Sequence, residues 1–251
     1  TSETVGRAGQ WGGIKLEGTS ASGEFKHAVV EYSSYGIYFA GISDRTVKIE
    51  ESVIRYNSDY GIRGDRNSGG NNNNRATITV ANSQIVDNYR HGIYAGEGYA
   101  KWEVKGCSIL RNGEYGVHLN RCYYQVITDN LIKENKQGIY LGYNNWENDT
   151  KRIITGNEIS DNKASGLSIH GMEGNYDSVV ERISNNKINS NGGSGVYLSS
   201  GHHAKLEVKG NEIKGNKGDG FGFHANLYNN PVFEDNVIEN NEGQGVYFNQ
   251  I

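Results

Sequence analysis

Several side chains that can move protons or neutralise charge recur at matching positions near the middle of this chain. His118 or Tyr140 could remove a proton from carbon, and either Arg63 or Arg121 could neutralise a carboxylate beside that carbon. A uronate lyase or epimerase needs this combination, because the C5 proton is removed more easily once the neighbouring carboxylate is neutralised. The candidate catalytic residues are therefore His118, Arg63, Tyr140, Arg121 and Asp65.

The same types of side chain also suit binding without catalysis. Tyrosine rings offer flat apolar faces that match the C–H faces of sugar rings, whereas Asn, His and Arg match hydroxyls and carboxylates. A polysaccharide is therefore the expected partner. Alternatively, the tyrosines only reflect the preference of aromatic residues for half-exposed strands. The candidate ligand-binding residues are Tyr38, Tyr94, His118, Asn120, Tyr140, Tyr143, His170, Tyr197 and His224.

A repeat that runs through the whole chain must position these residues. The unit G-Φ-x-Φ, where Φ is apolar, occurs ten times, and its leading glycines are 22 to 31 residues apart. Apolar residues spaced by two are typical of strands, and no unit has the apolar stripe of a helix. The units are residues 13–16, 36–39, 61–64, 92–95, 116–119, 138–141, 166–169, 195–198, 220–223 and 245–248.

Such a short unit cannot cover its own apolar face, but it can stack on a copy of itself. Stacked coils about 4.8 Å apart let each strand pair with its counterparts above and below. The expected fold is therefore an all-β, single-stranded parallel β-helix of about ten coils, a solenoid that forms one domain over residues 1–251. A fragment of a longer chain would show the same pattern.

Asparagines recur at fixed positions and predict ladders along the stack. An asparagine follows the central apolar residue of nearly every unit by three residues, as Asn135 follows Ile132. Because Gly and Asn tolerate left-handed turns best, we expect these asparagines in the bends between strands. There each side-chain amide can donate to the amide oxygen of the next coil. A second ladder is expected from Asn130 onward, and Cys107 occupies the equivalent position one coil earlier.

The pattern N-x-I-x-x-N-x-x-x-G-Φ-x-Φ resembles the right-handed parallel β-helix repeat of the pectin-lyase-like superfamily over residues 11–251. The resemblance implies a right-handed coil, as does the usual hand of parallel crossovers, and a place among carbohydrate-binding proteins and sugar hydrolases. It also implies a secreted or cell-surface location and, by resemblance only, Ca²⁺ as a cofactor. The N-T-D, D-D, G-H-G and R-I-K set of polygalacturonases and the D-P-H motif of mannuronan epimerases do not occur.

The outward positions of the units describe a groove along the stack. The two apolar side chains of each unit point inward, so x points outward. A second outward column lies two residues further along each unit and includes Glu17 and Asp65. A glycosidase would need two carboxylates about 5–10 Å apart, but these two are the only carboxylates in both columns and lie about two coils apart. The first outward column is Lys15, Tyr38, Arg63, Tyr94, His118, Tyr140, Ser168, Tyr197, Gly222 and Tyr247.

Composition argues against several other classes of protein. The net charge of −4 favours neither nucleic acid nor an anionic membrane surface as a partner, and no apolar run approaches the ~20 residues that span a bilayer. Cys107 and Cys122 supply no disulfide framework and no metal-ligand spacing, so we expect two unpaired thiols and no metal site. The sequence predicts a polysaccharide-binding module, with a uronate lyase or epimerase and a purely structural stalk or adhesin segment as alternatives.

Overall fold

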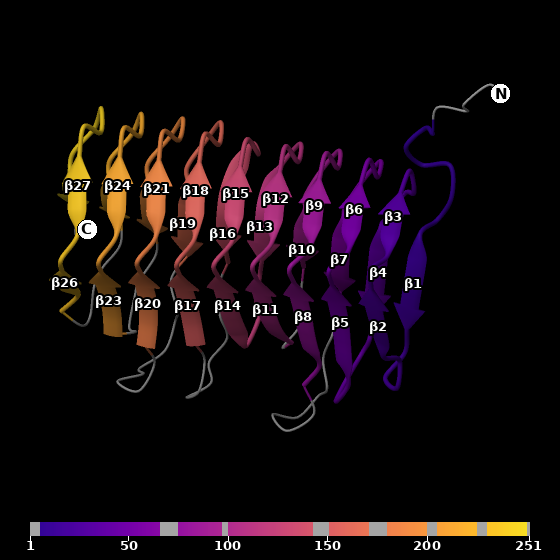
Figure 1. Ribbon diagram of the computed structural model, residues 1–251. Coiled ribbons are helices and arrows are strands. Elements are labelled where there is room, and N and C mark those ends of the chain that lie inside the picture. Colours follow the sequence, from indigo (N-terminus) through magenta and orange to yellow (C-terminus); the bar gives the residue numbers. More distant parts are fainter. Residues whose placement is uncertain are drawn as a thin grey trace.

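All regular structure in the described part of the chain is β-strand. The structure is a computed structural model that describes residues 6–65, 75–96, 100–142, 151–170, 180–199, 205–224 and 230–249. Figure 1 shows the strands stacked side by side along one axis, in chain order from β1 on the right to β27 on the left. The predicted all-β solenoid is therefore confirmed.

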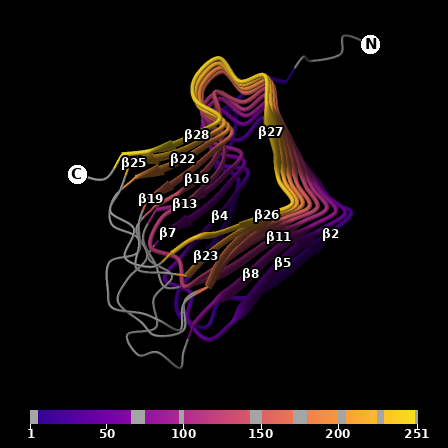
Figure 2. The ribbon, with the colours of Figure 1, turned by 90° about the vertical axis from the view of Figure 1, so that its left-hand side faces the viewer.

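The strands form three parallel sheets that run along the stack, as the view along its axis shows (Figure 2). The first sheet carries the G-Φ-x-Φ units. Its strands are β1 (Ile14–Glu17), β4 (Ile37–Ala40), β7 (Ile62–Asp65), β10 (Ile93–Ala95), β13 (Tyr115–Leu119), β16 (Gln137–Leu141), β19 (Leu167–His170), β22 (Val196–Ser199), β25 (Phe221–His224) and β28 (Val246–Phe248).

The second and third sheets complete each coil. The second comprises β2 (Gly23–Lys26), β5 (Thr46–Glu50), β8 (Thr77–Ala81), β11 (Lys101–Lys105), β14 (Tyr124–Thr128), β17 (Lys151–Thr155), β20 (Val180–Ser184), β23 (Lys205–Lys209) and β26 (Val232–Glu234). The third comprises β3 (Val29–Glu31), β6 (Val53–Arg55), β9 (Gln84–Val86), β12 (Ser108–Leu110), β15 (Leu131–Lys133), β18 (Glu158–Ser160), β21 (Lys187–Asn189), β24 (Glu212–Lys214) and β27 (Val237–Glu239). With ten strands in the first sheet and nine in each of the others, the described residues complete slightly fewer than the ten coils expected.

Like residues lie above like residues in the core. In the third sheet, Ile109 pairs with Ile85 on one side and with Ile132 on the other. All three side chains are fully buried, and burial of each isoleucine stabilises the fold by about 2 kcal/mol. A chain that is only 35% hydrophobic can therefore build a continuous core, because every inward position packs against two neighbours.

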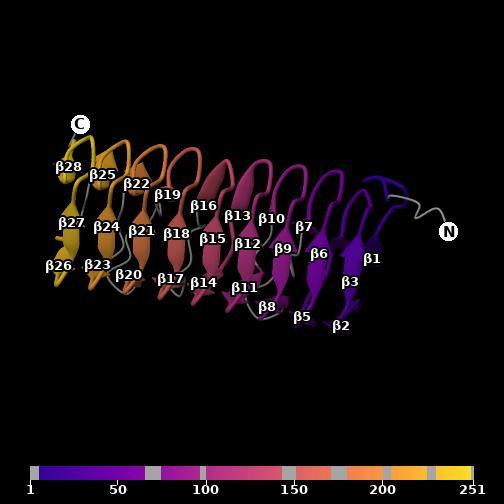
Figure 3. The same cartoon turned by 45° about the horizontal axis from the view of Figure 1, so that its top comes forward.

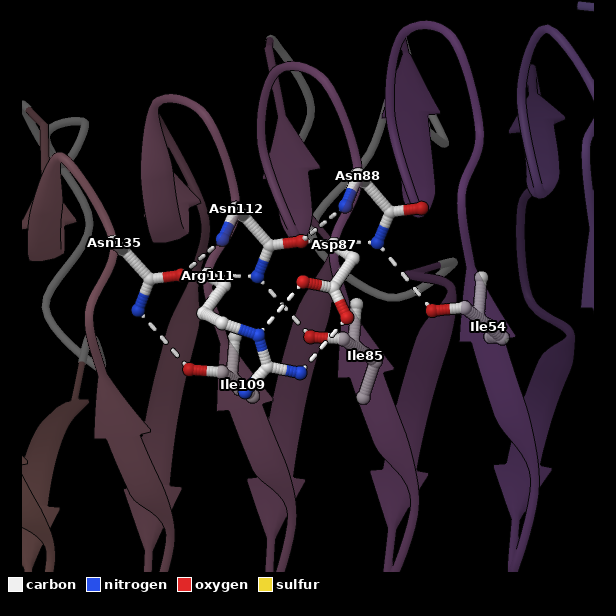
Figure 4. A network of polar contacts seen from close by, with 8 residues as sticks. All are labelled: Ile54, Ile85, Asp87, Asn88, Ile109, Arg111, Asn112 and Asn135. Carbon is white, nitrogen blue, oxygen red and sulfur yellow. Dashed lines mark hydrogen bonds and ion pairs between the residues drawn. The ribbon is translucent and has the colours of Figure 1, made fainter. Parts of the chain in front are cut away.

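An asparagine ladder fills the bend between the third and first sheets. Asn112 Nδ2 donates to Asn135 Oδ1 (3.0 Å) and to the carbonyl of Ile85 (3.1 Å), and its backbone N–H donates to the same Asn135 oxygen (2.9 Å). Asn88 repeats this pattern one coil earlier (Figure 4). An unpaired buried amide costs about 1–3 kcal/mol, so the ladder removes a large penalty. The predicted ladder is confirmed in full: Asn57, Asn88, Asn112, Asn135, Asn162, Asn191, Asn216 and Asn241.

The second predicted ladder is confirmed as well, in the turn between the second and third sheets. Asn130 Nδ2 donates to Asn157 Oδ1 (2.9 Å), and the backbone N–H of Cys107 donates to Asn130 Oδ1 (2.9 Å). Cys107 and Cys122 are buried and unpaired, as expected. Burial raises the pKa of their thiols to about 11 and about 12, respectively. Both cysteines are therefore protonated packing residues at neutral pH.

The left-handed residues of the bends differ from those expected. Figure 3 shows these bends as a row of similar loops that lead from the third sheet to the first. The residue with positive φ is the one before the ladder asparagine, as in Asp87 (56°) and Arg111 (53°). The side chains of these two residues form a bidentate ion pair between coils, in which Arg111 Nε donates to Asp87 Oδ1 (2.7 Å) and Nη2 donates to Oδ2 (2.8 Å) (Figure 4). The asparagine is thus required for its side-chain amide, and the expectation that it also supplies the left-handed turn is wrong.

Candidate functional site

The predicted outward column of the first sheet is a line of side chains aligned from coil to coil, which we call the outward file. Strand register places Arg63 between Tyr38 and Tyr94. His118 lies between Tyr94 and Tyr140 in the same way. The file is confirmed at every predicted position: Lys15, Tyr38, Arg63, Tyr94, His118, Tyr140, Ser168, Tyr197, Gly222 and Tyr247.

A second row of rings lies beside this file, and the sequence pattern did not predict it. Tyr60, His91 and Tyr115 directly precede the glycine of three successive units, and their ring centroids are 5.2 Å apart at both steps. Tyr60 also contacts Tyr94 of the file, at 5.0 Å. Strict strand alternation would turn this row inward, because it lies three residues before the outward position. The repeated aromatic residue before glycine was the available signal.

Together the two rows form one surface of touching rings on the first sheet. His118 lies 4.5 Å from Tyr140, and Tyr140 lies 4.9 Å from His170. The rings of the file are half-buried, so part of each remains accessible to a ligand. We call this surface the aromatic platform and define it as Tyr35, Tyr38, Tyr60, His91, Tyr94, Tyr115, His118, Tyr140 and His170.

Arg63 lies within the platform with its charge already compensated. Its guanidinium carbon is 4.9 Å from the Tyr60 ring centroid and 5.8 Å from that of Tyr94. Both Nε and Nη2 lie 2.7 Å from Asp65 Oδ2. Burial opposes the charge, but the hydrogen bond and the charge of Asp65 outweigh it and raise the pKa of Arg63. A substrate carboxylate would therefore have to compete with Asp65 for this cation.

A cleft with a volume of about 640 Å³ opens at the N-terminal end of the platform, beside Arg63. It brings together candidates from both predicted sets, because Arg63 and Asp65 meet Tyr38, Tyr94 and Asn120 in its wall. Its charges are paired, since Lys15 lies 2.8 Å from Glu17 and Arg63 is bound to Asp65. The cleft therefore offers ring faces and hydrogen-bonding groups with little net charge. Its described lining is Glu17, Tyr38, Ala40, Arg63, Asp65, Tyr94, Gly96 and Asn120.

His91 is held in one neutral form within the platform. The backbone N–H of Tyr115 donates to its Nδ1 (3.3 Å), so this nitrogen carries no proton, and Nε2 lies 2.9 Å from Glu114 Oε2. Burial, with a smaller contribution from the charge of His118, lowers the pKa of His91 to about 3. His91 therefore serves to orient neighbouring rings at neutral pH, as a hydrogen-bonded neutral imidazole.

His118 is also neutral, and this weakens its candidacy as a base. Burial, followed by the charge of His170, lowers the pKa of His118 to about 4. A general base works best with a pKa near the working pH, so this imidazole would be a weak base in neutral solution. Its Nδ1 is buried without a hydrogen-bond partner among the described residues. The arrangement suits contact with a ligand better than proton abstraction.

Further predicted binding residues continue the file beyond the cleft. His170 Nδ1 lies 2.9 Å from Ser199 Oγ. Tyr197 stacks on His224 with ring centroids 4.7 Å apart, and His224 lies 5.1 Å from Tyr247. The outward face therefore carries rings well past the platform, so an extended ligand would find contacts over many coils.

Two predicted residues are not placed in this surface. Arg121 is exposed in the turn after β13, where its φ is 52°. It does not belong to the described lining of the cleft. Tyr143 lies outside the described residues. Neither residue therefore adds support to a catalytic centre.

A buried arginine that the sequence analysis did not single out fixes the ends of two platform strands. Arg152 is fully buried and donates from Nη1 to the carbonyl of His170 (2.7 Å) and from Nη2 to the carbonyl of Gly142. Its Nε donates to Gln125 Oε1 (2.7 Å), and Nη1 lies 3.5 Å from Glu181 Oε1. Burial lowers the pKa of Arg152, and the Glu181 carboxylate opposes that shift. Arg152 thus holds the ends of β16 and β19 at the platform.

The described residues of the cleft do not fit a resident metal ion. The part of the chain that the structure describes has no group of three or more His, Cys, Asp or Glu side chains that could hold one. Ca²⁺ prefers six to eight oxygen ligands, and the acidic residues of the cleft are engaged with Lys15 and Arg63. Ca²⁺ as a cofactor is therefore expected only from the resemblance to the pectin-lyase-like superfamily.

The stacked parallel sheets, the ladders and the outward ring file define a parallel β-solenoid. The family model described as "Right handed beta helix region" matches residues 12–179 and 146–250, so the chain belongs to this family. The match supports the right-handed coil and is consistent with the resemblance to the pectin-lyase-like superfamily. No curated protein and no solved structure matched the chain. No helix in the described residues is long and apolar enough to cross a membrane.

Proposed function

We propose that this protein binds a polysaccharide along the aromatic platform. The observation that carries the proposal is the unbroken series of touching rings, with centroid separations such as 5.0 Å for Tyr94–His118 and 4.5 Å for His118–Tyr140, beside a polar cleft. Sugar rings stack their C–H faces on such aromatic surfaces, and polar groups at the edge select hydroxyl positions. A chain of sugars laid along the stack would contact several coils at once.

Binding is favoured over catalysis by one property of the cleft and one of the neighbouring platform. Asp65 already occupies the guanidinium of Arg63 (2.7 Å), and the low pKa of His118, about 4, makes it a weak base at neutral pH. A secreted or cell-surface setting belongs to the same proposal, and its support is the resemblance to the pectin-lyase-like superfamily.

The test compares wild-type protein with the Tyr94→Ala, Tyr140→Ala double variant on an array of neutral and acidic glycans, with and without Ca²⁺. At about 1 kcal/mol per aromatic contact, the double variant should bind its glycan about 2 kcal/mol more weakly, which is roughly thirtyfold. Tyr89→Ala is the matched control, because this tyrosine is 76% exposed and lies in a bend outside the platform. Because charges in the cleft are paired, retention should change little with salt.

Each other outcome of this experiment has a defined meaning. Equal retention of wild type and double variant, or no retention on any glycan, would exclude the platform as a binding site and favour a structural stalk. Release of an unsaturated uronate product, lost in His118→Ala with an unchanged circular dichroism spectrum, would show instead that the protein is a lyase.

A further inference from the structure

A separate group of cations and rings lies on the outer face of the second sheet. Strand register places Tyr124 of β14 directly between Lys101 of β11 and Lys151 of β17. Lys101 Nζ is 5.1 Å and Lys151 Nζ is 5.7 Å from the centroid of the Tyr124 ring. Two ammonium groups from different coils therefore converge on one tyrosine, although their strands lie about 10 Å apart at the usual strand spacing.

The neighbouring side chains fix the position of this ring. Tyr123 meets Tyr124 edge to face, with centroids 4.7 Å apart and planes at 78°. The guanidinium carbon of Arg75, a residue only 8% exposed, lies 3.2 Å from the Tyr123 ring centroid. Tyr124 itself is half-buried, so part of its ring is accessible. The cluster is thus a supported surface rather than a set of freely moving chains.

The two lysines differ in their charge environment from Lys205 and Lys209 of β23 in the same sheet. Lys205 lies 3.7 Å from a Glu207 oxygen, and Lys209 lies 2.9 Å from Glu234. Within the described residues, no carboxylate oxygen lies within 4.0 Å of the Lys101 or Lys151 ammonium. Two like charges therefore face one ring, in a protein whose net charge is −4. This local excess of positive charge complements an anion.

We propose that Lys101, Tyr124 and Lys151 form a second carbohydrate site, for a sugar that carries a carboxylate or sulfate group. The sugar ring packs on the accessible part of Tyr124, and the anionic group accepts hydrogen bonds from the two ammonium groups. Charge-assisted hydrogen bonds of this kind are stronger than those between neutral groups. The site lies on a different sheet from the aromatic platform, and the proposal does not depend on the function of that platform.

The experiment measures binding of three oligosaccharides by isothermal titration calorimetry. They are a galacturonic acid hexamer, a sulfated dextran and an unsulfated dextran of equal length, so that the carboxylate and sulfate sources are separated. Wild-type protein should bind at least one acidic ligand and bind it more weakly as salt rises, because exposed charges are screened. The Lys101→Gln, Lys151→Gln double variant should bind that ligand about tenfold more weakly.

Matched variants separate a specific site from general attraction. The Lys205→Gln, Lys209→Gln pair changes the net charge of the same sheet equally and should leave affinity unchanged. Glu103→Gln should strengthen binding, because Glu103 is an exposed outward residue of β11 on the same face as Lys101. The Tyr94→Ala, Tyr140→Ala double variant should bind the acidic ligand at this site as wild type does. A failure of the proposed lysine site can therefore be told apart from a failure of the proposed platform function.

Three results would overturn the proposal. In the first, wild-type protein binds neither acidic ligand. In the second, affinity for the acidic ligand falls equally in the two lysine double variants. In the third, wild-type protein binds the neutral dextran as tightly as the acidic ligands. Circular dichroism of each variant confirms that the fold is retained, which is expected because all the substituted lysines lie on the outer face of the sheet.

Discussion

At the scale of single residues, a ladder asparagine satisfies two backbone groups of the preceding coil and binds the side-chain amide of the following coil. Asn162 Nδ2 donates to Asn191 Oδ1 (2.9 Å) and to the carbonyl of Ile132 (3.2 Å), and its Oδ1 accepts from the backbone N–H of Asn135 (3.0 Å). Asn162→Ala should lower the free energy of unfolding by about 3 kcal/mol, because it leaves buried backbone groups unpaired. Urea unfolding followed by circular dichroism measures this change.

The control for the ladder is an asparagine outside it. Asn230 is exposed in the segment before β26, so Asn230→Ala should change the free energy of unfolding by less than about 0.5 kcal/mol. Similar losses in both variants would mean that the ladder hydrogen bonds add little net stability.

A half-buried histidine of the platform, His118, should make the free energy of unfolding depend on pH. The pKa of His118 is about 4 in the folded protein, below its ordinary value of 6.5. The unfolded chain therefore binds the proton more readily than the folded protein. The stability that His118 contributes as a neutral residue is complete above about pH 6.5 and is lost as the pH falls toward 4. When the pH falls from 7 to 4.5, the free energy of unfolding should therefore decrease by about 2 kcal/mol less in His118→Gln than in wild type, after allowance for partial exposure of the ring.

Urea unfolding at the two pH values gives the comparison, and carboxylates contribute equally to both proteins. His27→Gln is the matched control, because the His27 side chain is 66% exposed and lies beside Glu51 on the surface. A pH dependence identical in wild type and His118→Gln would show that His118 is not buried as a neutral group in solution.

At the scale of elements, the sequence predicted what repeats with a strict period. Apolar residues spaced by two identified the inward faces, and the outward file from Lys15 to Tyr247 followed from the same alternation. The row of Tyr60, His91 and Tyr115 did not follow, because the glycine after each one breaks the alternation. Arg152 was not singled out, since strand register alone does not show which carbonyls its guanidinium meets.

In the units that begin at Gly36 and run through Gly220, the leading glycine is required by close approach between coils rather than by an unusual backbone conformation. A Cβ at Gly116 would lie 2.8 Å from Ile132 Cγ2 and 2.9 Å from both Asn135 Nδ2 and the Gly138 carbonyl oxygen. Gly116→Ala should therefore destabilise the protein by about 2–4 kcal/mol, as overpacking does in other cores.

Thermal unfolding with Gly12→Ala as the control tests this requirement. A Cβ at Gly12 would have no neighbour within 4 Å, so that variant should unfold within a few degrees of wild type. If Gly116→Ala were equally harmless, the coils would have to be packed less tightly than the structure shows.

At the scale of the whole molecule, each coil contacts only its neighbours, so stability is a sum of coil and interface contributions. The same truncation should therefore cost more in a middle coil than in a terminal one. Ile132 is fully buried and pairs with Ile109 and Ile159, whereas Ile238 in β27 is partly buried and pairs with Ile213. Ile132→Ala should cost about 3–4 kcal/mol and Ile238→Ala about 1–2 kcal/mol.

Native-state hydrogen exchange shows how far each defect spreads. Loss of packing at Ile132 weakens two interfaces of the stack, so amides on both sides of β15 should exchange faster. Loss at Ile238 should speed exchange mainly in β26–β28, next to a stack that keeps its remaining interfaces. Equal costs, or a uniform increase in exchange along the chain for both variants, would show that the solenoid unfolds as one cooperative unit, and nearest-neighbour additivity would then not apply to it.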